Sequence, residues 1–171
     1  MRVLAAVVVL ALLAAPAVAD EGGHPAEKGT LGAGIMIGEP TGICAKLYLK
    51  DDQAVQAAFG YALGGGGFQL TADYVWHPFI LQDKDSFVLP VYVGPGIRLI
   101  DYSAGETGSS YFAEGVRAVV GMVFDFKNVP LDVFVEVAPI LEWRFVGSTE
   151  NKTISHVNVT LNGGVGVRYY F

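Results

Sequence analysis

The chain holds one cysteine, Cys44, among its 171 residues, so no disulfide can form within it. Basic residues are also few: 11 lysines and arginines stand against 17 acidic residues, and the formal net charge is −6. A chain with this balance lacks the basic face that neutralises phosphates, which argues against nucleic acid as a partner. The separations of the three histidines and Cys44 match no metal-binding motif. We therefore expect no metal and no other cofactor.

Long apolar runs are absent too, except at the start of the chain. Arg2 precedes an uninterrupted apolar run over residues 3–15, and the small residues at 17–19 form a typical export cleavage site. At a helical rise of about 1.5 Å per residue the run spans roughly 20 Å, short of a hydrocarbon core of about 30 Å. We expect residues 1–19 to be a signal peptide cleaved after Ala19, and residues 20–29 to be a flexible periplasmic lead.

The rest of the chain is rich in apolar residues that do not cluster. Hydrophobic residues reach 52%, yet from residue 30 onward they alternate with polar residues or glycine. The last segment is the clearest, because successive side chains of a strand point to opposite faces. Its apolar face would carry Val157, Val159, Leu161, Gly163, Val165, Val167, Tyr169 and Phe171.

This two-residue period predicts eight strands separated by turn signals and no convincing helix. The expected strands cover residues 30–38, 43–50, 53–62, 68–77, 87–99, 111–126, 131–143 and 157–171. An even number of strands lets both ends of a closed meander finish on the same side. The predicted fold is an all-β, eight-stranded antiparallel up-and-down transmembrane β-barrel over residues 30–171. The link at 78–86 is longer than the short turns expected at its end of such a barrel.

Charged residues fall mainly on the other face of these strands. An eight-stranded barrel is just wide enough inside to be filled by side chains. Because unpaired buried charges are costly, we expect the charges to pair and to close the lumen. A narrow ion-conducting path is the alternative. The predicted lumen network comprises Lys46, Asp73, Arg98, Arg117, Asp125, Asp132, Glu136, Glu142 and Arg168.

Aromatic residues stand near the ends of the expected strands, which favours two aromatic girdles at membrane interfaces. The outer girdle would hold Tyr61, Phe68, Tyr102, Tyr111, Phe112 and Trp143. The inner one would hold Tyr74, Trp76, Phe87, Phe124, Phe126, Tyr169 and Phe171.

The chain ends in an aromatic residue preceded by apolar residues at every second position: Val165, Val167, Tyr169 and Phe171. This ending resembles the assembly signal of outer-membrane barrel proteins. Residues 30–171 resemble the small eight-stranded barrels typified by OmpX and the membrane domain of OmpA. The stretches 38–42 and 72–77 are also similar to a poorly characterised group of that size. The resemblance implies insertion by the barrel-assembly machinery into the lipid of a bacterial outer membrane.

Three roles remain open at this stage besides the ion path. A monomer with a structural or surface-interaction role would use the outer links 101–110 and 145–156, since exposed loops often carry recognition. A lipid-modifying enzyme would need Ser155 and His156 with Glu150 or Glu142, but adjacent strand residues point to opposite faces, so we assign no catalysis. A soluble lipocalin-like carrier would invert the faces and place the apolar side chains inside.

Overall fold

The computed structural model describes residues 30–63, 66–102, 111–146 and 153–171. The expected signal peptide (1–19) and lead (20–29) lie outside the described residues, as do the tips of the two longest links, 103–110 and 147–152. The described part is all-β and contains no helix. Accordingly, it offers no helix of the length and apolar character needed to cross a membrane.

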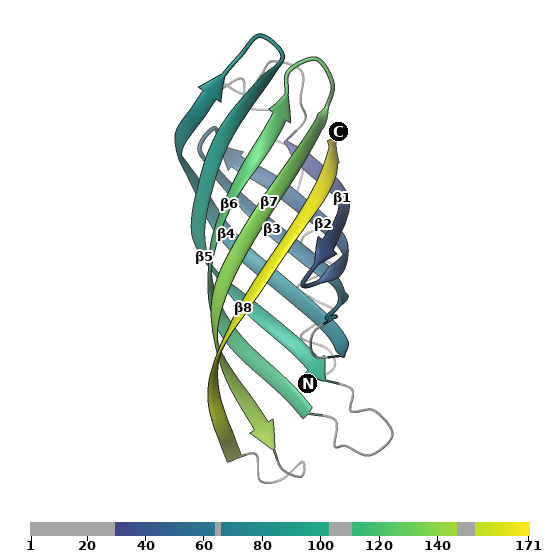
Figure 1. The fold of residues 1–171 in the computed structure, drawn as a ribbon, viewed down its shortest axis with the longest axis vertical. Coiled ribbons are helices and arrows are strands. Elements are labelled where there is room, and N and C mark those ends of the chain that lie inside the picture. Colours follow the sequence, from purple (N-terminus) through teal and green to yellow (C-terminus); the bar gives the residue numbers. More distant parts are fainter. Residues whose placement is uncertain (1–29, 64–65, 103–110, 147–152) are drawn as a thin grey trace.

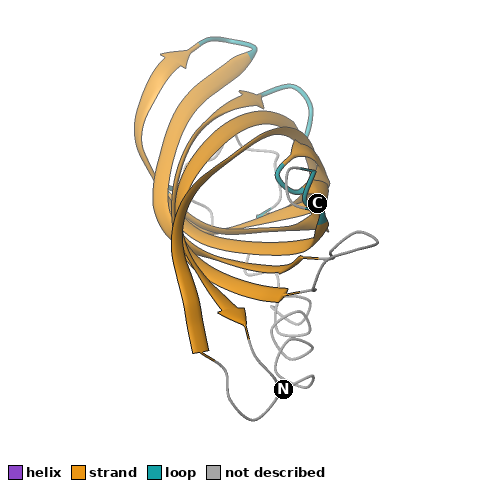
Figure 2. Cartoon of the chain, turned by 60° about the horizontal axis from the view of Figure 1, so that its bottom comes forward, coloured by secondary structure: helices purple, strands orange, loops and turns teal. Residues whose placement is uncertain are grey.

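Eight antiparallel strands follow one another in an up-and-down order and form one closed sheet. Each strand pairs with the next, and β1 pairs with β8, so the sheet closes into a ring (Figures 1 and 2). Where the strands are paired, the closed ring has no free strand edge. The backbone N–H and C=O groups there therefore find partners on neighbouring strands. The strands are β1 (Leu31–Gly38), β2 (Thr41–Lys50), β3 (Gln53–Tyr61), β4 (Gly67–Asp83), β5 (Phe87–Tyr102), β6 (Tyr111–Phe126), β7 (Leu131–Val146) and β8 (Thr153–Tyr170).

The two ends of the ring differ. At one end, which we name the turn end, short connections 51–52, 84–86 and 127–130 join β2 to β3, β4 to β5 and β6 to β7. The chain enters β1 and leaves β8 at this same end, where the Phe171 amide donates to the Leu31 carbonyl oxygen at 3.0 Å. The opposite end, the loop end, carries the other four links.

The prediction of a long link over residues 78–86 is wrong. β4 continues through Pro78 to Asp83 and stays paired with β5, with register shifts between Trp76 and Phe79 and again between Ile80 and Gln82. Proline cannot donate to a sheet ladder, which is why the sequence indicated a break, but irregular positions on a strand accommodate it. The β4–β5 hairpin therefore ends in a tight turn and projects beyond β3, whose pairing with β4 stops at Trp76 (Figure 1).

The segment 145–156 is likewise shorter as a link than expected. β7 runs to Val146 and β8 starts at Thr153, so only residues 147–152, outside the described part, separate the two strands. The link expected at 101–110 shortens in the same way, because β5 runs to Tyr102.

The alternation of the sequence matches the two faces of the sheet. On β8, Val159 is 75% exposed and Leu161 71%, whereas Asn162 and Arg168 between the apolar positions are buried. The same contrast runs along β6, where Val116 and Val120 are exposed while Arg117 and Asp125 are buried. Apolar side chains thus cover the outside of the ring, and the ionised ones point into it.

The interior is not purely polar. Val75, Val119, Val123 and Phe134 are buried and belong to one apolar cluster inside the ring. These residues share a face with the charges, and they fill the space between them. Glycine provides room here: a Cβ atom at Gly121 would lie 2.2 Å from the ring of the buried Tyr92.

Aromatic side chains gather on the outside near both ends. Phe59 and Phe68 stack with ring centroids 5.9 Å apart towards the loop end, and Tyr169 and Phe171 meet edge to face at 5.2 Å towards the turn end. Tyr102 contradicts its expected place in the outer girdle. It is buried inside the ring, because its position on β5 has the inward parity of Arg98.

Candidate functional site

The interior of the ring is the candidate site, because it gathers the chemically active side chains of strands far apart in sequence. All nine residues of the predicted lumen network lie buried there, each with at most 6% of its surface exposed. Four are basic and five acidic. β7 contributes three of the acids, Asp132, Glu136 and Glu142, which point inward at different heights. Each of these three carboxylates organises a separate cluster.

The cluster nearest the turn end is built on Asp132. The Arg168 guanidinium donates to both carboxylate oxygens, with Nε–Oδ1 at 3.0 Å and Nη2–Oδ2 at 2.9 Å. The two residues are direct partners in the β7–β8 register. The Tyr170 hydroxyl adds a third donor to Asp132 at 2.6 Å. The guanidinium carbon also lies 4.1 Å from the centroid of the Phe134 ring, a cation–π contact. Bidentate pairing of this kind is the strongest geometry for a buried ion pair.

The middle cluster is the largest. Arg117 bridges two carboxylates, with Nη2 2.9 Å from Glu136 Oε1 and Nε 3.0 Å from Asp73 Oδ1. The Gln56 amide donates to the same two carboxylates, at 2.9 Å and 3.1 Å. The Tyr92 hydroxyl donates to Glu136 at 2.7 Å. These contacts join β3, β4, β5, β6 and β7 across the interior, so they fix the ring's cross-section rather than one strand pair.

The third cluster lies towards the loop end. Arg98 Nη1 donates to Glu142 Oε2 at 2.6 Å, and its Nε donates to the Gln69 side-chain oxygen at 2.9 Å. Its other amino group lies 3.8 Å from the Glu39 carboxylate, which comes from the β1–β2 link. The Tyr102 hydroxyl donates to Glu142 at 3.3 Å. This cluster therefore connects the interior to a link at the surface.

One arrangement repeats in all three clusters: a β7 carboxylate accepts from one arginine and one tyrosine. The predicted network omitted the tyrosines Tyr92, Tyr102 and Tyr170, as well as Gln56 and Gln69. Four of these positions carried a usable signal, because Gln69, the two tyrosines of β5 and Tyr170 each have the inward parity of an arginine or carboxylate on their own strand. Gln56 lies on β3, which has no charged residue, and its polarity alone marked its face. What the pattern could not provide was the height of each residue along the ring, and thus its partner.

Lys46 differs from the arginines. It is fully buried, and its ammonium lies 2.8 Å from His77 Nε2. His77 Nδ1 lies 3.2 Å from the Asp52 carbonyl oxygen, so Nδ1 carries the proton and Nε2 accepts from Lys46. The rings of Tyr48 and Tyr92 flank the ammonium at 4.8 Å and 4.7 Å. A neutral imidazole and two ring faces hold this charge, a weaker arrangement than a carboxylate would give.

The variant Lys46→Met tests this difference. We expect the free energy of unfolding to change by at most about 1 kcal/mol, because removing a buried charge relieves a desolvation cost that offsets the lost contacts. Denaturant titration of the folded protein measures the change. A loss as large as that expected for an arginine of the clusters would contradict the assignment.

The middle of the interior is closely filled. The void lined by Met36, Cys44, Thr71 and the middle-cluster residues measures about 10 Å³, roughly the space of one water molecule. Asp125 lies nearer the turn end, where it lines a larger cavity. At the level of the middle cluster, side chains thus occupy most of the described interior.

Of the residues considered for catalysis, Glu142 has a side chain within the described part of the structure. Glu142 is held by Arg98 and Tyr102. Ser155 and His156 belong to β8, but their side chains lie outside the described residues, and so does Glu150. Among the residues that the structure describes, no group of three histidine, cysteine or acidic side chains is placed to hold a metal ion.

The expected assembly signal comprises three outward residues of β8 and the residue that follows the strand: Val165, Val167, Tyr169 and Phe171. All are at least 36% exposed on the outer face, next to β1 and β7. Their role in assembly stays a prediction.

Comparisons with protein-family models, with curated proteins and with solved structures find no match.

Proposed function

We propose that this protein is a bacterial outer-membrane β-barrel, monomeric, with a structural or surface-interaction role and a lumen closed by ion pairs. The observation that carries the proposal is the inversion of its two faces: nine ionisable side chains are buried inside, and aliphatic side chains cover the outside. A protein in water gains by burying apolar surface and leaving charges exposed. The opposite arrangement suits a ring surrounded by acyl chains.

The distribution of charge on the outer face supports the same proposal. The outward positions in the middle of β6, β7 and β8 are apolar or glycine, such as Val120, Val137 and Val159. Outward carboxylates occur at Asp101 and Glu114, which pair in register with the aromatic residues Phe68 and Trp143. Charges at the level of the aromatic residues would meet the headgroup region, where they cost little.

A soluble lipocalin-like carrier fits this arrangement poorly. Such a carrier would need an apolar interior with room for a ligand and a polar exterior. Here the middle of the interior holds Arg117, Asp73 and Glu136 and leaves space for about one water. An exposed apolar surface as extensive as this one would also drive association in water.

Cell fractionation against outer-membrane marker proteins is the experiment that tests the proposal. We expect the full chain to accompany the outer-membrane markers and to remain with the membranes after a wash in high salt, since lipid contact is apolar and does not weaken with salt. Recovery in the soluble periplasmic fraction would overturn the proposal.

The closed lumen gives a second expectation. Purified protein in a planar bilayer should show no stable, reproducible conductance steps, because the middle cluster and its neighbours fill the cross-section. A pore would instead need a continuous water path through this layer. Reproducible single-channel steps from the wild-type protein would favour the ion-path alternative.

The surface-interaction part of the proposal concerns the links at the loop end, 101–110 and 145–156, whose tips lie outside the described residues. Loops on a rigid scaffold are where recognition is commonly found. Deleting the tip of either link should weaken binding to a surface ligand without unfolding the ring.

A further inference from the structure

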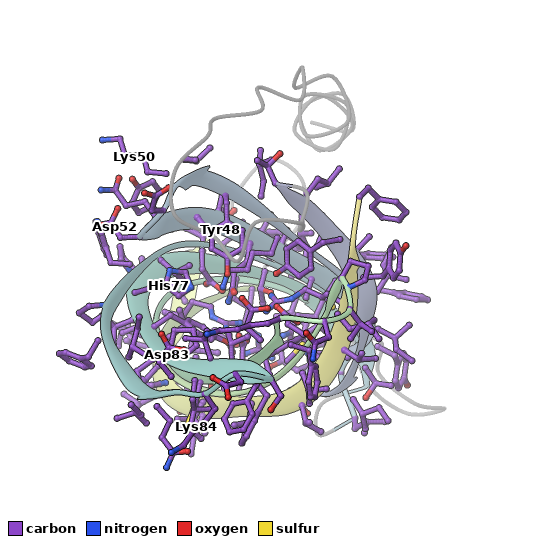
Figure 3. All side chains as sticks on the ribbon, turned by 90° about the horizontal axis from the view of Figure 1, so that it is seen from above. Tyr48, Lys50, Asp52, His77, Asp83 and Lys84 are labelled. Atoms are coloured by element: carbon purple, nitrogen blue, oxygen red, sulfur yellow. The ribbon has the colours of Figure 1, made fainter. Side chains whose placement is uncertain are left out.

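The turn end of the ring opens into a cavity of about 390 Å³ that the closed lumen does not require. Its size falls in the range of small-molecule sites, roughly 300–1,000 Å³. The middle cluster lies deeper in the ring, so this cavity is a pocket that opens at the turn end and not part of a channel. Figure 3 looks onto this end, with Tyr48, His77 and Asp83 around the opening.

One wall of the cavity is apolar. It is the inner face of the projecting β4–β5 hairpin, where Ile80, Val88 and Pro90 line the space. Ile80 and Pro90 are direct partners in the strand register. The register shift at Pro78 turns Ile80 inward, while its neighbour Phe79 pairs with the outward Val91. The β4–β5 hairpin, which includes the residues expected to form a long link at 78–86, thus forms this wall.

The floor is aromatic and held in place. The rings of Tyr48 and His77 lie 5.4 Å apart and both line the cavity. His77 is fixed from two sides, by the Lys46 ammonium below it and by the Asp52 carbonyl oxygen. A floor fixed in this way can contact a bound molecule with little reorganisation.

The remaining lining residues are strongly acidic. Four carboxylates line the cavity, from Asp51, Asp52, Asp83 and Asp125, against one ammonium, Lys127, which is paired with Asp83. The nearby Lys50 and Lys84 are absent from the lining, and both point away from the ring (Figure 3). Lys46 lies behind the His77 ring and is buried, so it offsets part of this charge from below.

We infer that this cavity, the turn-end mouth, is a binding site for a small amphipathic organic cation. The apolar wall would contact the hydrocarbon part, the rings of Tyr48 and His77 would face the cation, and the carboxylates would neutralise it. A purely inorganic cation would leave the apolar wall unused, and an anion would be repelled. The inference goes beyond the proposed function, since it holds whatever role the outer loops have.

Calorimetric titration of the full chain in zwitterionic lipid nanodiscs tests the inference, with 2-phenylethylammonium as the probe and empty nanodiscs as the blank. We expect saturable binding that weakens as salt is raised. The neutral isostere 2-phenylethanol should bind at least about tenfold more weakly, the equivalent of one well-placed charge interaction. Equal binding of the cation and the alcohol would overturn the inference.

Three charge variants and two shape variants separate the contribution of charge from that of shape. Replacing Asp51→Asn together with Asp52→Asn should weaken cation binding about three- to tenfold. The matched control is Asp85→Asn, which removes an exposed charge from the same end without touching the lining. Lys127→Gln should strengthen binding, because it removes a competing cation from Asp83.

The shape test uses the hairpin wall. Ile80→Trp should fill the space and abolish binding, while Phe79→Trp on the outer face of the same hairpin should leave it unchanged. Retained binding in Ile80→Trp, or no effect from the Asp51 and Asp52 changes, would overturn the inference. Both outcomes are independent of fractionation and conductance, so they do not bear on the membrane proposal.

Discussion

Replacing Arg168 by methionine should cost about 3–5 kcal/mol of unfolding free energy, the largest effect expected of any single change inside the ring. The substitution leaves the Asp132 carboxylate buried and without the donors that now reach both of its oxygens. The Tyr170 hydroxyl would still donate to it. Denaturant titration of the protein in lipid vesicles, followed by the fluorescence of its two tryptophans, measures the loss.

Two comparisons make this result specific. The double variant Asp132→Leu with Arg168→Met removes both charges, so most of the loss should be recovered, because no buried charge is left unpaired. Lys127→Ala breaks the more exposed pair with Asp83 and should cost less than about 1 kcal/mol. A small effect of Arg168→Met would mean that water reaches Asp132, and it would contradict the closed lumen.

Placing arginine at Val137 should destabilise the protein by about 2–4 kcal/mol in lipid. Val137 is 49% exposed on the outer face and pairs with Val120 and Gly163, next to the level of Glu136 and the middle cluster. If the outside of the ring contacts acyl chains, an arginine at mid-height must drag water or headgroups inward. The same denaturant titration in vesicles measures the change.

Val129→Arg is the matched control. Val129 has a similar exposure, 44%, but belongs to the β6–β7 turn at the turn end. An arginine there would reach the interface, and the expected cost is about 0–1 kcal/mol. If both variants were neutral, the exposed aliphatic surface would be in contact with water, and the membrane proposal would fail.

The two variants probe opposite faces of the same wall, which β7 and β8 form together. Arg168→Met removes a charge that the inside needs, and Val137→Arg adds a charge that the outside cannot accommodate. A soluble protein with the same closed sheet would respond in the first case but not in the second. The pair therefore distinguishes the fold from its surroundings.

Much of the wall could be predicted from alternation alone. On β8 the period of two runs with few exceptions from Val157 to Phe171, and the structure places Leu161 and Val165 outside and Asn162 and Arg168 inside. The prediction was weakest where the period slips. Near Pro78, β4 has extra residues relative to its partner β5. The local sequence pattern could not distinguish such an irregular strand from a loop.

No local sequence pattern could predict which side chains pair with one another inside the ring. Arg117 on β6 meets Asp73 on β4 and Glu136 on β7 only because β4, β5, β6 and β7 pair in one particular register. Tyr102 was expected at the outer girdle because tyrosines favour interfaces, yet strand parity turns it towards Glu142. Register and closure are collective properties of all eight strands, which no single segment reveals.

The amino-acid order by itself determined the strands and the division of residues between two faces, because side chains of an extended chain alternate whatever surrounds them. Only the closed sheet decided which face is enclosed, which arginine meets which carboxylate, and where the turn-end mouth lies. Those features depend on distances between strands far apart in the sequence, and ring closure through the β1–β8 pairing sets those distances.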